Sequence, residues 1–95
     1  MVDPCWQQTE ISDHKFQRVF RSDLRDHELV WHRDHHDRSV RVIHNQGWQL
    51  QMDNQLPVLI QTGQEFKIPA LVFHRLIRGS GDLIVEITQS VMPDE

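Results

Sequence analysis

Short runs in which hydrophobic and polar residues alternate follow one another along the chain from residue 28 to residue 89. The clearest run is GWQLQMD, where Trp48, Leu50 and Met52 alternate with polar residues and therefore share one face of a strand. Turn-forming stretches such as DNQ, TGQ and RGSG separate the runs. The pattern predicts about seven strands, at residues 28–34, 39–44, 47–53, 56–61, 65–68, 71–77 and 82–88.

The connections between these runs are too short to hold the crossover helices that parallel strands need, so we expect an all-β antiparallel sandwich or barrel. Residues 16–20, FQRVF, are compatible with a strand or a helical turn. We prefer a strand, because it would cover a sheet edge that is otherwise open. The predicted organisation is an N-terminal segment at 1–27, partly flexible and with one added strand, a barrel at 28–89, and a flexible tail at 90–95.

The size and composition of the chain fit one small domain with one core. The 95 residues are 38% hydrophobic and 25% charged. A formal net charge of -4 without a basic stripe argues against nucleic acid or an anionic membrane as the main partner. Cys5 is the only cysteine, so no internal disulfide can form. Because we find neither a long apolar run nor the pattern of a signal peptide, we expect a cytoplasmic protein.

The segment WHRDHHDR, residues 31–38, contains side chains that can bind a metal. On a strand, His32 and Asp34 project to the same face, because they are two positions apart. His74 follows about forty residues later, on a second predicted strand. Two imidazoles and one carboxylate can form the facial triad that binds iron(II) and leaves coordination positions open, and the same residue types suit zinc or manganese.

Over residues 28–89 the chain resembles the cupin superfamily, known for a double-stranded β-helix barrel and two short motifs. The first motif begins H-x-H and continues to a glutamate and a glycine; HRD at 32–34 resembles its start. The second runs from a glycine through P-x-G to a histidine and an asparagine; GQEFKIPALVFHRLIR resembles it, with its spacings intact, from Gly63 through Pro69 to His74. The resemblance implies an antiparallel double-stranded β-helix, the cupin jelly-roll barrel.

The departures from these motifs bear on the metal site. Asp34 stands where the second histidine is usual and can still bind a metal, whereas the glutamate position falls on Arg38, whose guanidinium only donates hydrogen bonds. Leu71 replaces the glycine of P-x-G, and Arg78 replaces the closing asparagine. The resemblance therefore implies at most three of the four usual ligands, which are His32, Asp34 and His74.

Two interpretations of this pocket stay open. In the first, a divalent metal (iron, zinc, manganese or nickel) binds the three ligands, and Arg38 points aside or binds an acidic substrate. In the second, Arg38 occupies the metal's place and pairs with Asp34 as a built-in cation. A fixed positive charge within about 4 Å opposes metal entry by a few kcal/mol at an effective dielectric constant near 20.

Five residues are predicted to contact a ligand. Trp48, Leu50 and Met52 are expected to form an apolar wall of the barrel, and Arg38 or Arg75 to orient a carboxylate through a bidentate contact. The favoured function is binding of a small polar or acidic ligand, because the fourth metal ligand is lost and tyrosine, a common proton donor in such barrels, is absent. A metal-dependent oxygenase, isomerase or epimerase and a structural dimer module are the alternatives.

Strand alternation places Trp31 on the outer face, away from His32. An exposed tryptophan often marks an interface, and small cupins resembling this chain are often dimers packed sheet to sheet. We therefore expect a homodimer. The alternative is that residues 1–27 of the same chain cover Trp31.

Overall fold

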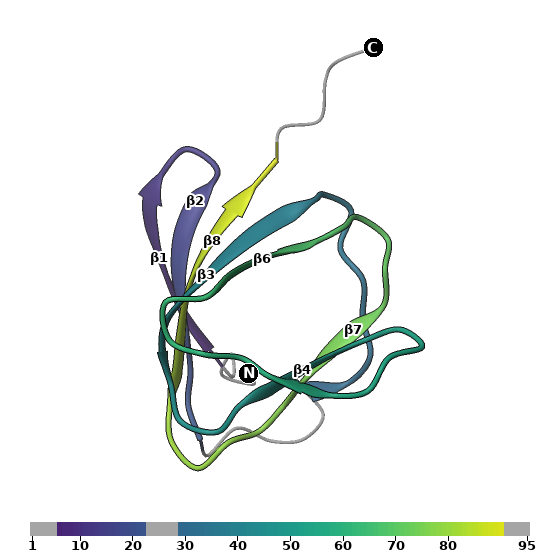
Figure 1. The fold of residues 1–95 in the computed structure, drawn as a ribbon. Coiled ribbons are helices and arrows are strands. Elements are labelled where there is room, and N and C mark those ends of the chain that lie inside the picture. Colours follow the sequence, from purple (N-terminus) through teal and green to yellow (C-terminus); the bar gives the residue numbers. More distant parts are fainter. Residues whose placement is uncertain (1–5, 23–28, 91–95) are drawn as a thin grey trace, which may run out of the picture.

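The computed structural model describes residues 6–22 and 29–90, whose regular structure consists of strands. The strands are β1 (Trp6–Ser12), β2 (Lys15–Phe20), β3 (Arg38–Asn45), β4 (Gln49–Met52), β5 (Val58–Leu59), β6 (Glu65–Ile68), β7 (His74–Ile77) and β8 (Leu83–Gln89). They form a five-stranded sheet in the order β1-β2-β8-β3-β6 and a three-stranded sheet in the order β5-β4-β7. Every strand pair is antiparallel. In Figure 1 the five-stranded sheet faces β4 and β7 across the interior.

Inward-facing side chains of both sheets make the hydrophobic core. Along β8, Leu83, Val85 and Ile87 are buried in strict alternation, as the period of a strand with one covered face requires. Trp48 is fully buried, and its indole N–H donates a hydrogen bond to the Gly81 carbonyl at 2.6 Å, which satisfies its one polar group. The remaining core residues are Val40, Val42, Leu50, Ile60 and Ile68.

The N-terminal segment adds a hairpin to the five-stranded sheet. β2 includes the predicted strand at 16–20 and pairs with β8, which confirms that this segment extends the sheet. β1 then pairs with β2 and forms the sheet edge. The hydrophobic pattern did not predict β1, because WQQTEIS is too polar to show an apolar face.

The prediction of a strand at 28–34 is wrong for residues 29–34, the part of it that the structure describes. Residues 29–34 contain only one isolated bridge, between His32 and His74. Beyond the bridge, single hydrogen bonds hold the stretch that leads to β3. The Leu71 N–H donates to the Asp34 carbonyl at 2.7 Å, and the Ala70 N–H donates to the Asp37 carboxylate at 2.6 Å. Leu71 has a left-handed φ of 67°, which ends regular pairing on the opposing segment.

Two other predicted strands are shorter than expected. The run at 71–77 yields β7 from His74 onward, because the turn at Leu71 comes first. The run at 56–61 yields only β5, since Pro57 has no N–H to donate to a ladder. The predicted turns at Asn54 and Gly63 are present, each with a positive φ. Of the predicted tail at 90–95, residues 91–95 lie outside the described residues. Within the described ranges, no helix has the length and apolar character to cross a membrane.

Burial in the core predicts unequal effects for two leucines. Leu83→Ala removes a side chain with no exposed area and should lower the free energy of unfolding by about 2–5 kcal/mol. Leu56→Ala, at an 83% exposed position, should change it by less than about 0.5 kcal/mol. Urea unfolding followed by tryptophan fluorescence measures both. Equal effects of the two substitutions would contradict the described core.

Candidate metal site

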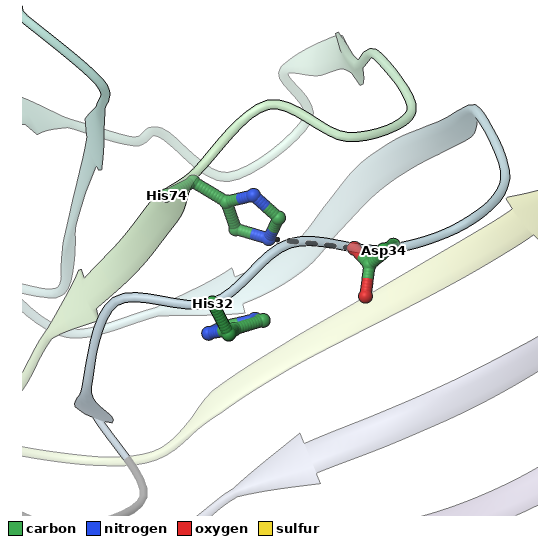
Figure 2. Close-up of side chains that lie close together, drawn as sticks. All are labelled: His32, Asp34 and His74. Atoms are coloured by element: carbon green, nitrogen blue, oxygen red, sulfur yellow. Dashed lines mark ion pairs between the residues drawn. The ribbon is translucent and has the colours of Figure 1, made fainter.

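Backbone pairing sets the positions of the two histidines. The His32 N–H donates to the His74 carbonyl at 3.0 Å, and the His74 N–H donates to the His32 carbonyl at 2.9 Å. Residues that exchange both hydrogen bonds lie directly opposite each other, so their side chains project from the same face. The centroids of the two imidazole rings are accordingly 4.4 Å apart, in an edge-to-face arrangement. Figure 2 shows the two rings next to each other.

Each imidazole is oriented by a backbone carbonyl from its own segment. His32 Nδ1 lies 2.9 Å from the Val30 carbonyl oxygen, and His74 Nδ1 lies 2.9 Å from the Val72 carbonyl oxygen. A carbonyl oxygen only accepts hydrogen bonds, so each Nδ1 must carry the proton. In the neutral ring Nε2 then has a free lone pair. This is the outer hydrogen bond that usually orients a metal-binding histidine.

Asp34 supplies a carboxylate to the same place. Its Oδ2 lies 3.4 Å from His74 Nε2, along the dashed line in Figure 2. Asp34 Oδ2 is buried and has no hydrogen-bond partner among the described residues. A buried carboxylate oxygen without a donor is costly, so this atom calls for a cation or a proton beside it.

His74 is in the protonation state that suits a ligand. The side chain lies at the buried end of the site, with 4% of the residue exposed. Burial lowers the pKa of His74 below its ordinary value; the Val72 hydrogen bond and the charge of Asp34 oppose this shift, while His32 and Arg38 add to it. The neutral imidazole that results is the form that binds metals.

The spacing of the three side chains fits a metal ion. One potential ligand atom from each of His32, Asp34 and His74 lies within 4.8 Å of the others. Ligand atoms bound at about 2.1 Å in a tetrahedral or octahedral site lie roughly 3.0–3.4 Å apart. The 3.4 Å between Asp34 Oδ2 and His74 Nε2 already has this value. A divalent cation would satisfy both the orphaned carboxylate oxygen and the free imidazole lone pairs.

Arg38, at the start of β3, lies beside this cluster. Its Nη1 is 3.4 Å from Asp34 Oδ1, and its Nη2 donates to Gln89 Oε1 at 3.3 Å. Gln89 is the residue opposite Arg38 in the β3–β8 ladder. Arg38 therefore engages one oxygen of Asp34, whereas the other oxygen, Oδ2, faces His74. The guanidinium pairs with Asp34 as one interpretation expected, but it contacts Oδ1 and not the oxygen that faces the histidine.

A cavity of about 410 Å³ adjoins the cluster. At one end it is lined by His32, Asp34, Arg38 and His74. Most of the remaining lining is apolar and comes from both sheets: Phe20, Val30, Val40, Leu50, Ile60, Phe66, Ile68, Leu76, Leu83, Val85 and Ile87. Arg18 of the N-terminal hairpin also lines it and donates hydrogen bonds to Gln8.

The structure places two of the five predicted contact residues on this cavity. Arg38 and Leu50 line it, whereas Trp48, Met52 and Arg75 do not. Trp48 is buried in the core, where its ring packs on neighbours and leaves no surface for a ligand. Arg75 follows His74 on β7 and therefore projects to the opposite face of the strand. That alternation was readable in the sequence and would have excluded Arg75.

Several lining residues were not predicted, and they come from two sources. Phe20 and Arg18 belong to the N-terminal hairpin, whose packing against β8 was only partly foreseen. Phe66, Ile68 and Leu76 face inward by the same alternation that identified Leu50. The alternation of inward and outward side chains along β6 and β7 could therefore have identified these three residues from the sequence.

Trp31 lies on the outside, as strand alternation predicted. It is 40% exposed, and the Arg75 guanidinium lies 4.9 Å from its ring centroid, a cation–π contact. Arg75 also donates to Gln51 Oε1 at 2.8 Å, so both polar residues sit on the outer face of the three-stranded sheet. The homodimer expected from Trp31 stays a prediction.

Comparison with known proteins identifies the fold. No protein-family model matches the chain, and no curated protein matches it. Among solved structures, a cupin domain from Bordetella pertussis Tohama I is 20% identical, with a TM-score of 0.63 over 96% of this chain and 99% of that one. A cupin-2 domain containing protein from Shewanella frigidimarina is 19% identical, with a TM-score of 0.65 over 94% of this chain and 85% of that one.

An enzyme structure is similar over a smaller share of its own length. A structure described as DMSP lyases is 13% identical to this chain, with a TM-score of 0.67 over 81% of this chain. The aligned part is 37% of that lyase chain. Together with the two antiparallel sheets, these likenesses show that the chain has the cupin fold, which confirms the predicted all-β double-stranded β-helix.

The hydrogen bonds of the two histidines predict their tautomers. In their neutral form, His32 and His74 should both carry the proton on Nδ1, because a carbonyl oxygen faces each Nδ1. Long-range ¹H–¹⁵N correlation spectra of the metal-free protein distinguish the two tautomers. Protons on Nε2 of both rings would mean that the lone pairs do not face Asp34.

Proposed function

We propose that this cupin-fold chain binds a divalent transition metal through His32, Asp34 and His74 and holds a small molecule in the adjoining cavity. The observation that carries the proposal is that one possible ligand atom each of His32, Asp34 and His74 lies within 4.8 Å of the others. Among the described residues, each imidazole Nδ1 lies near a backbone carbonyl and the buried Asp34 Oδ2 has no hydrogen-bond partner. Two nitrogen ligands and one oxygen ligand suit iron(II), zinc, manganese or nickel.

Different residues would have different roles at such a metal site. The Val30 and Val72 carbonyls fix the rings of His32 and His74, which makes Nε2 the ligand atom of each. Asp34 provides the negative charge that a buried dication needs. Apolar side chains line most of the cavity next to the ligands and would pack against the apolar part of a bound molecule. When bound, the metal would supply a Lewis acid or a centre for oxygen activation, with coordination positions that three protein ligands leave open.

Binding without turnover is the function that the site supports best. The titratable side chains among the described lining residues are those of the three proposed ligands and two arginines. Once the ligands hold a metal, none of these residues is left to act as an independent general acid or base near neutral pH. The site is therefore better equipped to hold a molecule than to move its protons.

A metal-dependent enzyme is the second candidate. It is favoured by the position of the cavity, which the three ligands line together with apolar side chains. The DMSP lyases among the similar structures are enzymes of this fold, although this chain corresponds to 37% of that lyase chain. The molecule in the cavity would determine whether such an enzyme is an oxygenase, an isomerase, an epimerase or a lyase.

Metal uptake tests the proposal directly. Chelator-treated protein incubated with zinc or iron(II) and then desalted should retain about one ion per chain by elemental analysis. His74→Ala and His32→Ala should each weaken uptake by more than the 10- to 100-fold that loss of an outer hydrogen-bond partner costs a metal site. His44→Ala is the matched control, because His44 is exposed and lies outside the cluster. Metal-free wild-type protein, or uptake that survives both substitutions, would contradict the proposal.

Arg38 offers a second test of the same site. Arg38→Glu replaces a fixed cation with a carboxylate that can serve as a fourth ligand. We expect zinc affinity to rise at least about tenfold, since the opposing charge within a few ångströms is removed. Arg38→Gln removes the charge without adding a ligand and should give a smaller gain. Titration calorimetry against a competing chelator measures both. If the glutamate variant binds zinc no more tightly than the glutamine variant, residue 38 does not stand at a ligand position.

A further inference from the structure

The cavity has a strongly uneven distribution of polarity. His32, Asp34, Arg38 and His74 lie together at one end. Apart from Arg18, the other described lining residues are hydrophobic. A ligand that fills this space must therefore present a polar or charged head to one end and an apolar body to the rest.

The Arg38 guanidinium has more N–H donors than its contacts with the described residues satisfy. A guanidinium has five N–H groups. Its contacts with Asp34 and Gln89 measure 3.4 and 3.3 Å, well beyond the roughly 2.7–2.9 Å of a good charge-assisted hydrogen bond. Arg38 Nε is buried and has no hydrogen-bond partner in the part of the chain that the structure describes. The side chain lines the cavity and keeps 17% of its surface exposed, so it can still accept an anion.

Charge balance at this end of the cavity also calls for an anion. Asp34 is the one carboxylate among the described lining residues. It neutralises Arg38 when the cluster holds no metal. With a dication on His32, Asp34 and His74, the same carboxylate faces both the metal and the guanidinium. The excess positive charge would then lie next to an apolar cavity, where an uncompensated charge is costly.

We propose that the cavity takes a small monocarboxylate with an apolar body, whose carboxylate is held by Arg38 and whose body packs along the hydrophobic lining. This inference rests on the proposed function, because it names the ligand class of the same site. The volume of about 410 Å³ admits roughly a dozen non-hydrogen atoms, at about 30 Å³ for each water-sized unit. Sugars fit less well, since their hydroxyl groups would lose hydrogen-bond partners against the hydrophobic lining.

The test compares three probes that share one body: 4-phenylbutyrate, 4-phenylbutanol and 4-phenylbutylamine. Each is titrated by calorimetry into chelator-treated and zinc-treated wild-type protein. The carboxylate should bind at least about tenfold more tightly than the alcohol, and the amine should bind most weakly, because only the carboxylate gains charge-assisted hydrogen bonds from Arg38. The ¹H–¹⁵N signal of Arg38 Nε should shift on addition of the carboxylate alone.

Matched arginine variants assign the effect to Arg38. Arg38→Met should weaken carboxylate binding by about 10- to 100-fold, the loss expected for hydrogen bonds to a charged group. Arg75→Met should leave it unchanged, because Arg75 stacks on Trp31 outside the cavity. The three-probe comparison on wild-type protein keeps the test valid if Arg38→Met does not fold.

The outcomes separate this inference from the proposed metal function. Absence of zinc uptake overturns the metal site, whereas carboxylate binding to chelator-treated protein that depends on Arg38 still supports the ligand class. Binding that appears only with zinc and also depends on Arg38 supports both. The inference is overturned if the alcohol binds as tightly as the carboxylate, if Arg38→Met binds normally, or if no probe binds to either form.

Discussion

Two reciprocal backbone hydrogen bonds between His32 and His74 hold the candidate site together. They join the irregular segment before β3 to the start of β7 and place both imidazoles on one face. The carbonyls of Val30 and Val72 then turn each ring so that Nε2 is free. This bridge, together with the hydrogen bond from the Leu71 N–H to the Asp34 carbonyl, fixes the distance between two histidines that belong to separate segments. The chemistry of the site depends on this pairing more than on any regular strand.

Asp34 lies between His74 and Arg38 and interacts with both. One of its oxygens faces His74 and the other faces Arg38, each at 3.4 Å. The carboxylate can therefore serve a metal through Oδ2 while it keeps the guanidinium beside the cavity through Oδ1. Under the two proposals made above, this shared use would let a chain with an arginine at the glutamate position of the motif keep three metal ligands and gain an anion-binding group. Apolar burial around the site strengthens both electrostatic interactions.

The alternating pattern predicted the barrel because its strands have one covered face, and the spacing of the motifs predicted the three clustered side chains. Prediction from the alternating pattern failed where strand pairing is not regular. Residues 29–34 bridge β7 at a single position, since Leu71 adopts a left-handed φ that non-glycine residues rarely take. That position is a glycine in the cupin motif that the sequence resembles, and glycine adopts a positive φ without strain. Strand β1 was missed because a polar edge strand has no apolar signature.

The central claim is that Nε2 of His32, Nε2 of His74 and Oδ2 of Asp34 bind one metal ion. Anomalous diffraction at the zinc edge, from a crystal of zinc-loaded protein, tests it most directly. We predict a single strong peak about 2.0–2.2 Å from all three atoms, with the Arg38 guanidinium beside it. A crystal without a peak at that point, or one in which the guanidinium lies between the carboxylate and the imidazoles, would contradict the account.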